Sequence, residues 1–552
     1  MKNYVSFFLL FSLCGLSQNY YLRIESPSVL EKKIIDSLNY SSKLPSVKKI
    51  IEEQQAFQNK LLLAGFLEAE ISKQEKTNDS TFVFTYSLGT QTKNILVQCN
   101  DLSTFDKNLL EIDTNVKLLL SEVENYLNTK LNLLEKKGYA QAKLKLINFK
   151  IQQASLEANL YLELNAIRKI NKLVVSGYSD FPKGVKRLYE KKYAGKTFNQ
   201  ETIKTIYKDF NSLPFVNQPK YPEVLLTKDS TDIYIYLEKR KNNSFDGFIG
   251  FGTNEAKQKL QFNGYLDLNL YNNLNKGERF NLYWKNDGNK QSTFNAKLEL
   301  AYLFQLPLAF KGNLKIFRQD TIFQQSSFDA DLGYMFSYNT KAYIGVKEST
   351  SEAIQKNPNA TLKDLTSNFI TTSISHQKLN YDNEVFPEVF SMNIKMGIGS
   401  RKIGLDKTNQ FFSQLQANYL LEVNKKNYIH LKTDTYYLQS TTYYTNELYR
   451  FGGIQSIRGF NENSLQGNLF TGVFTEYRYI VASNLYVHTL TDFGYFQDKA
   501  NQTSANLYGF GFGLGLLNKS GIFNLVYANG SSSGQTFKLS NSIVQVSLKT
   551  TF

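Results

Sequence analysis

The chain is poor in the residues that build disulfides and metal centres. It has 2 cysteines and 3 histidines in 552 residues. Cys14 lies in an apolar leader, so a mature protein would keep Cys99 alone, which excludes an intramolecular disulfide and a cysteine metal cluster. The histidines are scattered, and we expect neither a metal ion nor a cofactor.

Long hydrophobic runs are also lacking. After the leader there is no apolar run of roughly eighteen residues, the length that a membrane-spanning helix requires. A protein of this sequence could therefore cross a membrane only with β-strands. A mean hydropathy of -0.36 combined with 36 Tyr and 41 Phe fits a barrel in which every second residue meets lipid. A large soluble β-rich protein would have the same composition.

The net charge is +15, but the lysines are spread along the chain without a dense basic tract. A nucleic-acid partner is therefore not expected, and a surface close to anionic lipid is favoured.

The first residues predict a secretory signal peptide. Lys2 is followed by the apolar run Val5–Leu16 and by small residues, a pattern that is typical of a cleaved leader covering residues 1–17. A lipoprotein anchor at Cys14 is disfavoured, because Leu13 stands where a small residue would be needed.

Residues 19–241 alternate strand-like and helix-like patterns that repeat. The clearest internal echo pairs AGFLEAEI (Ala64–Ile71) with KGYAQAKL (Lys137–Leu144). Three β-α-α-β-β units are predicted, and one larger αβ domain is the alternative. The expected boundaries are 18–90, 91–167 and 168–241.

From Phe245 onward the pattern has period two, with apolar residues on one face and polar residues on the other. In KLQFNGYLDLNLY, Leu266 and Leu268 alternate with Asp267 and Asn269. A strand with one fully polar face needs water on that side. Residues 242–552 are therefore predicted to form a transmembrane β-barrel of sixteen antiparallel strands. Expected strand starts lie near residues 245, 258, 277, 292, 311, 326, 340, 368, 388, 409, 427, 469, 484, 506, 521 and 542.

One long segment, Asn446–Asn468, separates the eleventh and twelfth predicted strands. It carries the glycine pair Gly452-Gly453 and, shortly after, Ile457-Arg458-Gly459-Phe460. Together with its place in the strand order and the preceding repeats, this segment resembles the loop motif of the BamA/TamA superfamily of outer-membrane insertases and translocases. The resemblance covers essentially all of the mature chain. It implies that the three repeats are periplasmic POTRA domains.

The resemblance also implies that the loop arginine folds into the barrel lumen to meet acidic residues. Strand alternation places the two carboxylates of the next predicted strands, Glu476 and Asp492, on lumenal faces, where the planar fork of Arg458 can bind them. The alternative is a surface loop whose Arg458 has no partner.

The two ends of the predicted barrel should meet at a weak seam. The first strand, GFIGFGT, is expected to be short and lacks side chains at Gly247, Gly250 and Gly252, while Val546 lies on the last strand. Phe552 resembles the terminal aromatic residue of an outer-membrane β-signal, although Thr550 departs from that pattern.

These features predict a protein of the cell outer membrane that inserts client β-barrels or translocates substrates. Its expected partners are unfolded outer-membrane or secreted clients and the lipid bilayer, with periplasmic accessory proteins as further candidates. The alternative is a dedicated pore of the two-partner secretion type. No enzymatic activity is expected. The pattern Gly530–Gly534 fits a hydrolase motif, but it is expected between two barrel strands, whereas the motif requires a strand followed by a helix.

Overall fold

The computed structural model describes residues 19–152, 155–254, 259–286, 291–354, 361–518, 521–535, 538–539 and 542–552. The predicted signal peptide lies outside these residues. The chain forms two compact units, one built from the described residues up to Lys169 with Thr197–Glu201, the other from Ile170–Lys196 with Thr202–Phe552. Among the described helices, none is both long and apolar enough to cross a membrane.

The first unit begins with a four-stranded sheet of order β2-β1-β4-β3, covered by two helices. Helix α2 begins after Ser46, whose side chain accepts a hydrogen bond from the backbone of Lys49, and it buries Ile50, Phe57 and Leu61 at helical spacing. The elements are β1 (Tyr20–Glu25), α1 (Val29–Ser37), β2 (Lys43–Leu44), α2 (Val47–Leu63), β3 (Glu70–Asn78) and β4 (Thr81–Ser87).

A second sheet in this unit has the order β6-β5-β8-β7. Its first strand pairs in parallel with its last, as β1 does with β4, and Cys99 is buried in its core. The elements are β5 (Asn94–Gln98), α3 (Thr104–Leu110), β6 (Val116–Leu119), η1 (Leu120–Glu122), α4 (Val123–Lys136), β7 (Lys143–Gln152) and β8 (Ser155–Glu163).

The second unit opens with a third αβ sheet of order β11-β12-β9, again with its first and last long strands in parallel. Residues that connect its elements contact turns of the barrel: Asn272 donates to the hydroxyl of Tyr178 over 2.8 Å, and the rings of Phe215 and Tyr338 meet edge to face at 5.4 Å. The elements are β9 (Lys172–Ser176), α5 (Lys183–Tyr193), α6 (Gln200–Asn211), β10 (Val216–Asn217), β11 (Glu223–Leu226), β12 (Thr231–Tyr236) and β13 (Glu238–Lys239).

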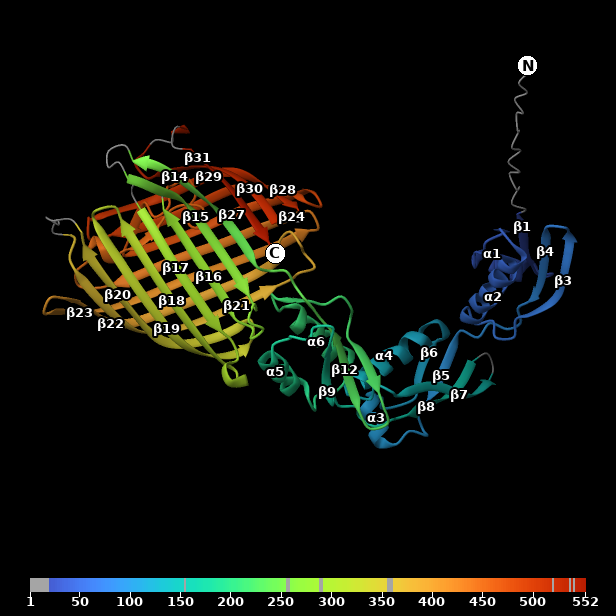
Figure 1. Ribbon diagram of the computed structural model, residues 1–552. Helices are drawn as coiled ribbons and strands as arrows, with labels where there is room; N and C mark the ends of the chain where they lie inside the picture. The colour runs from blue at the N-terminus through green and yellow to red at the C-terminus, as the bar shows by residue number, and fades with distance from the viewer. Residues whose placement is uncertain are drawn as a thin grey trace, which may run out of the picture. The chain divides into compact units, whose positions relative to one another are not determined.

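The rest of the second unit is a closed antiparallel barrel of sixteen strands (Figure 1). The predicted barrel is confirmed, and each predicted strand start lies within three residues of the observed one. The strands are β14 (Ser244–Asn254), β15 (Lys259–Tyr271), β16 (Arg279–Asn286), β17 (Gln291–Leu300), β18 (Leu308–Gln319), β19 (Phe323–Ser337), β20 (Thr340–Ala353), β21 (Leu365–Leu379), β22 (Glu388–Ile403), β23 (Asp406–Asn424), β24 (Asn427–Gln439), β27 (Leu469–Ala482), β28 (Leu485–Asp498), β29 (Thr503–Asn518), β30 (Gly521–Ser532) and β31 (Ile543–Thr551).

The two faces of the barrel wall differ in polarity because side chains alternate along each strand. Ile344, Ile398 and Phe512 point outward and are 65%, 64% and 63% exposed, whereas Asp331 and Arg401 point inward and are 1% and 2% exposed. The outer surface is therefore apolar and the lumen is polar and charged, as a membrane barrel requires.

Candidate functional site

The segment between β24 and β27 folds as a hairpin. After the short helix η3 (Thr445–Glu447), strands β25 (Tyr449–Phe451) and β26 (Leu465–Gly467) form a two-stranded sheet of their own. The ring of Phe451 stacks on that of Phe470 in β27, with centroids 3.9 Å apart. Ile457 lies in the same apolar cluster, and Phe460 packs against it. The hairpin is thus held to the barrel wall by its own apolar core.

Arg458 lies between two barrel carboxylates. Its Nε donates to Asp492 Oδ2 over 2.8 Å and its Nη2 donates to Asp492 Oδ1 over 2.5 Å. The backbone N–H of Arg458 donates to Asp492 Oδ2 over 2.9 Å. Its Nη1 forms an ion pair with Glu476. The structure therefore brings together the three charged residues that the sequence analysis singled out.

This cluster is buried and pairs opposite charges. Arg458 is 7% exposed and Asp492 is fully buried. Glu476 also accepts a hydrogen bond from Arg478 Nε over 2.7 Å, so two arginines face two carboxylates. A buried ion pair holds its geometry strongly when its charges are matched and hydrogen-bonded, because removal of one partner leaves a desolvated charge.

Paired glycines form a notch for the loop backbone. Gly509 of β29 and Gly530 of β30 lie opposite each other in the ladder. A Cβ on Gly509 would lie 2.5 Å from the Arg458 carbonyl oxygen, and one on Gly530 would lie 2.5 Å from that of Gly459. Gly459 has a φ of +85°, a backbone conformation that favours glycine. A larger side chain at any of these three positions would push the loop off the wall.

The loop also contacts the first strands of the barrel. Glu462 forms an ion pair with Lys285 of β16 and accepts a hydrogen bond from the hydroxyl of Tyr283 over 2.7 Å. Sequence analysis did not single out Glu462 or its partners. The available signal was an acidic residue four positions after the motif arginine, in a loop expected to enter a lumen with many lysines.

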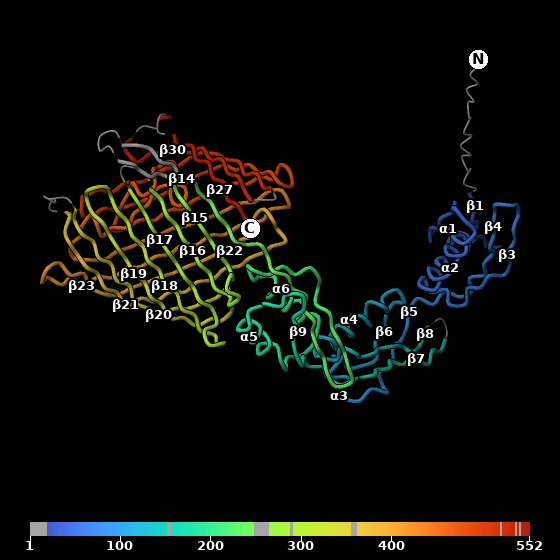
Figure 2. Tube along the Cα trace, in the orientation of Figure 1, coloured from blue at the N-terminus to red at the C-terminus, as the bar shows by residue number. Residues whose placement is uncertain are grey.

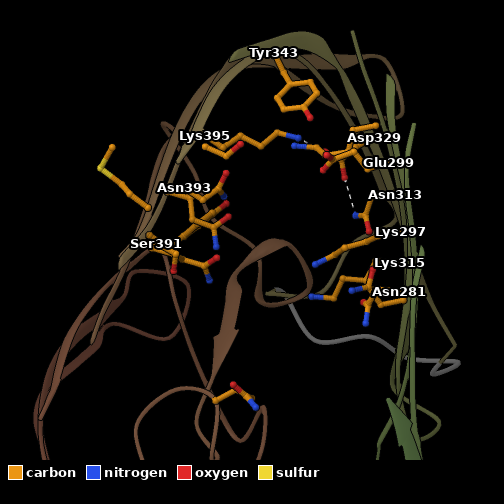
Figure 3. Close-up of a pocket in the computed structure, with 18 of the residues that line it drawn as sticks. Asn281, Lys297, Glu299, Asn313, Lys315, Asp329, Tyr343, Ser391, Asn393 and Lys395 are labelled. Atoms are coloured by element: carbon orange, nitrogen blue, oxygen red, sulfur yellow. Dashed lines mark hydrogen bonds and ion pairs between the residues drawn. The ribbon is translucent and has the colours of Figure 1, made fainter. Parts of the chain in front are cut away.

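The loop contributes Gln455 and Asn463 to the lining of a lumenal cavity of about 1030 Å³. Figure 3 shows Lys395 reaching across to Asp329 while Lys297 and Lys315 point into the open space. The distance from Lys395 Nζ to Asp329 Oδ1 is 2.6 Å. Cations outnumber carboxylates in the lining, which consequently attracts anionic groups.

The seam between the first and last strands is short. Among the described residues, β14 and β31 share three register pairs, which join Ser244–Asp246 to Lys549–Thr551. The N–H of Phe552 adds a hydrogen bond of 2.9 Å to the carbonyl of Asn243. By contrast, β14 pairs with β15 from Ser244 to Asn254. The first strand has eleven residues, so the expectation that it is short was wrong; the short feature is its ladder to β31.

The residues predicted at the seam lie beyond that ladder. Gly247, Gly250 and Gly252 pair with residues of β15, and Val546 pairs with Leu525 of β30. Each belongs to one of the two strands that border the seam, in the part where β14 and β31 have no register partner among the described residues. Figure 2 shows the C-terminus, which directly follows β31, close to the point where the chain enters β14.

Comparisons with known proteins give distant similarities. No family model and no curated protein match the sequence. Among solved structures, the chain is similar to BamA from Haemophilus ducreyi lacking POTRA domains 1–3, at 14% identity and a TM-score of 0.46, over 83% of this chain and 99% of that one. It is similar to CdiB from Acinetobacter baumannii at 13% identity and a TM-score of 0.49, over 91% and 97% of the two chains. CdiB from Escherichia coli gives 12% and 0.49, over 94% and 98%.

Proposed function

We propose that this protein works at the outer membrane without covalent chemistry, assembling client β-barrels into the membrane or moving substrates across it. The observation that carries the proposal is the combination of a loop bound in the lumen through Arg458 with a barrel whose end strands share three register pairs. A plain structural barrel needs neither feature. A barrel that opens sideways to admit a strand needs a weak edge, and it needs something to control that edge.

The surface of the barrel supports a membrane location. Apolar residues face outward and charged residues face inward, so the wall suits lipid outside and water inside. The αβ sheets precede the barrel in the chain and, as POTRA-like repeats, would lie in the periplasm.

Client capture would use the edges of the αβ sheets. Strand β7 is an edge strand of its sheet, and its residues Phe149 and Ile151 are 58% and 54% exposed. An extended client segment can add to such an edge through main-chain hydrogen bonds, with the exposed apolar side chains supplying contact area. Because main-chain bonds carry little sequence information, this mode accepts varied clients.

A dedicated secretion pore is the second candidate. The lumenal cavity, with its cationic lining, favours it, because an exported chain would pass through the lumen and not through the seam. The two candidates differ in the route that the substrate takes. Locking the seam would stop insertion of client barrels through the seam, but it would not stop export through the lumen.

The location is tested by fractionation. The mature protein is expected to begin near Gln18, to sediment with the outer membrane, and to migrate differently on gels before and after boiling, because a closed barrel resists detergent until heated. Recovery of an intact soluble periplasmic protein would rule out the proposed location.

The function is tested by depletion of the protein followed by a survey of the outer-membrane proteome. If the protein is an assembly factor, its depletion is expected to lower the amounts of several barrel proteins in the outer membrane at least severalfold. Unfolded forms of these proteins should accumulate in the periplasm. Loss of a single exported protein would favour the dedicated pore, and an unchanged proteome and secretome would contradict both candidates.

A further inference from the structure

We infer that residues Arg458–Asn463 of the loop form a strap across the seam. Glu462 is the positioning residue that attaches this strap to the first strands of the barrel. This inference rests on the proposed function, since it concerns control of the seam. Its evidence is the set of contacts that the loop makes on the two sides of that seam.

One end of the strap is fixed to the last strands. Arg458 binds Asp492 of β28, and the next residue, Gly459, lies against Gly530 of β30. The other end is fixed to the first strands. Glu462 binds Lys285 and Tyr283 of β16, and the carbonyl of the following residue, Asn463, accepts a hydrogen bond of 3.4 Å from Gln291 of β17.

The strap has little slack. Around the closed barrel, the path from β30 to β16 runs through β31, β14 and β15. Four strand spacings of roughly 4.8 Å make about 19 Å along the wall. The three residue steps from Gly459 to Glu462 span at most about 10 Å, so the loop follows a chord and the side chains of Glu462 and Lys285 complete the distance. Separation of β31 from β14 would pull this ion pair apart.

The strap also crosses the part of the seam where β14 and β31 have no register partner among the described residues. The three β14–β31 register pairs involve Ser244–Asp246, at the end of the barrel that carries the third αβ sheet. Lys285 lies near the opposite end of β16, one residue before its last residue Asn286. Gly530 is likewise close to that end of β30. The backbone ladder and the strap therefore close opposite ends of the same seam.

The close packing of the loop supports this role. Gly453 has a φ of +97°, and a Cβ there would lie 3.0 Å from the Cα of Glu462. The glycine pair thus lets the two arms of the loop approach each other and fixes the position of the glutamate. The side chains of Glu462 and Lys285 keep 23% and 33% of their exposure, so water can reach this pair. This ion pair can break without the large penalty that protects the buried Arg458 cluster.

The test measures the width of the seam directly in the full-length protein without client. Spin labels at Val544 on β31 and Leu266 on β15 are expected to give one short distance by pulsed electron resonance. Lys285→Glu, which places two carboxylates together, is expected to add a population longer by at least one strand spacing, about 5 Å. The charge swap Lys285→Glu with Glu462→Lys is expected to restore the short distance.

The matched control is Lys432→Gln, which adds no negative charge beside the Arg458 cluster. Lys432 of β24 donates to the carbonyl of Gln455 over 2.5 Å, so this change disturbs a contact of the same loop on its own side of the seam, and the short distance should persist. Glu462→Gln serves as a milder variant if Lys285→Glu fails to give a heat-modifiable barrel. An unchanged distance in both seam variants, or a swap that does not restore it, would overturn the strap. A widened seam with normal client assembly would instead leave the strap standing and contradict the proposed function.

Discussion

Cysteines at Phe245 and Thr550 are expected to lock the seam and reduce client assembly to the background level until the disulfide is reduced. The two residues face each other in the β14–β31 ladder. Cβ atoms of directly opposed residues lie roughly 4.5–5.5 Å apart, which a small backbone adjustment brings within disulfide range. The locked barrel should still insert and remain heat-modifiable, because the bond joins strands that are already neighbours.

The control for this lock is the pair Phe523 and Leu548, which are opposed between β30 and β31. It places a disulfide on the same last strand but away from the seam, and activity should be retained. Native Cys99 is first replaced by alanine. It is 1% exposed and burial raises the pKa of its thiol, so this replacement removes a slow side reaction. Full activity of the locked seam would exclude the lateral route and favour transport through the lumen.

The reason for so large an effect is the cost of an open edge. Each unpaired backbone group in hydrocarbon costs several kcal/mol, so an unpaired strand edge in lipid is strongly driven to find a partner. A short ladder lowers the barrier to opening, and a waiting client strand supplies the missing bonds. A disulfide removes that exchange altogether.

Arg458→Ala is expected to release the loop from the wall and to impair assembly, while the barrel stays in the membrane. Deletion of one member of a buried pair costs roughly 3–5 kcal/mol, because the remaining carboxylates keep a desolvated charge. Arg458→Lys is expected to restore little, because lysine cannot reproduce the two-pronged contact with Asp492. The measurement is the rate of proteolysis within the loop, together with client assembly.

The control variant is Arg478→Gln. It removes the other arginine that binds Glu476 but leaves the loop contact with Asp492 intact, so the loop should stay protected from protease. Wild-type protection and activity in Arg458→Ala would show that the apolar cluster around Phe451 alone holds the loop.

Much of the barrel is predictable because period-two alternation is a local property. Glu476 and Asp492 could be placed on lumenal faces from their neighbours in the sequence, and the motif supplied Arg458. The contact of Glu462 with Lys285 could not be derived in this way, since it depends on the path of an irregular loop across the lumen. The length of the β14–β31 ladder could not be predicted either. It depends on which residues of the two strands pair across the seam, and the sequence of each strand gives no local sign of this pairing.

Glycine also had to be interpreted with the structure in hand. Alternating glycines such as those of β29 are typical of strands that another backbone approaches closely. At Gly509 that neighbour is the loop itself, whereas a Cβ at Gly515 would meet the ring of Tyr486 and one at Gly513 would meet His488. The missing side chains of β29 thus make room for the loop backbone at one position and for bulky side chains of the adjacent strand at the others.

The spacing of the loop contacts along the chain has a consequence for the order in which the barrel itself forms. Arg458 is 34 residues from Asp492 and 18 from Glu476, whereas Glu462 is 177 residues from Lys285. Closing a long segment of chain carries a larger entropy cost than closing a short one. The arginine contacts can therefore form within a C-terminal set of hairpins, before the early strands are in place. The glutamate contact forms only when the first strands arrive, and it is a signature of completed closure.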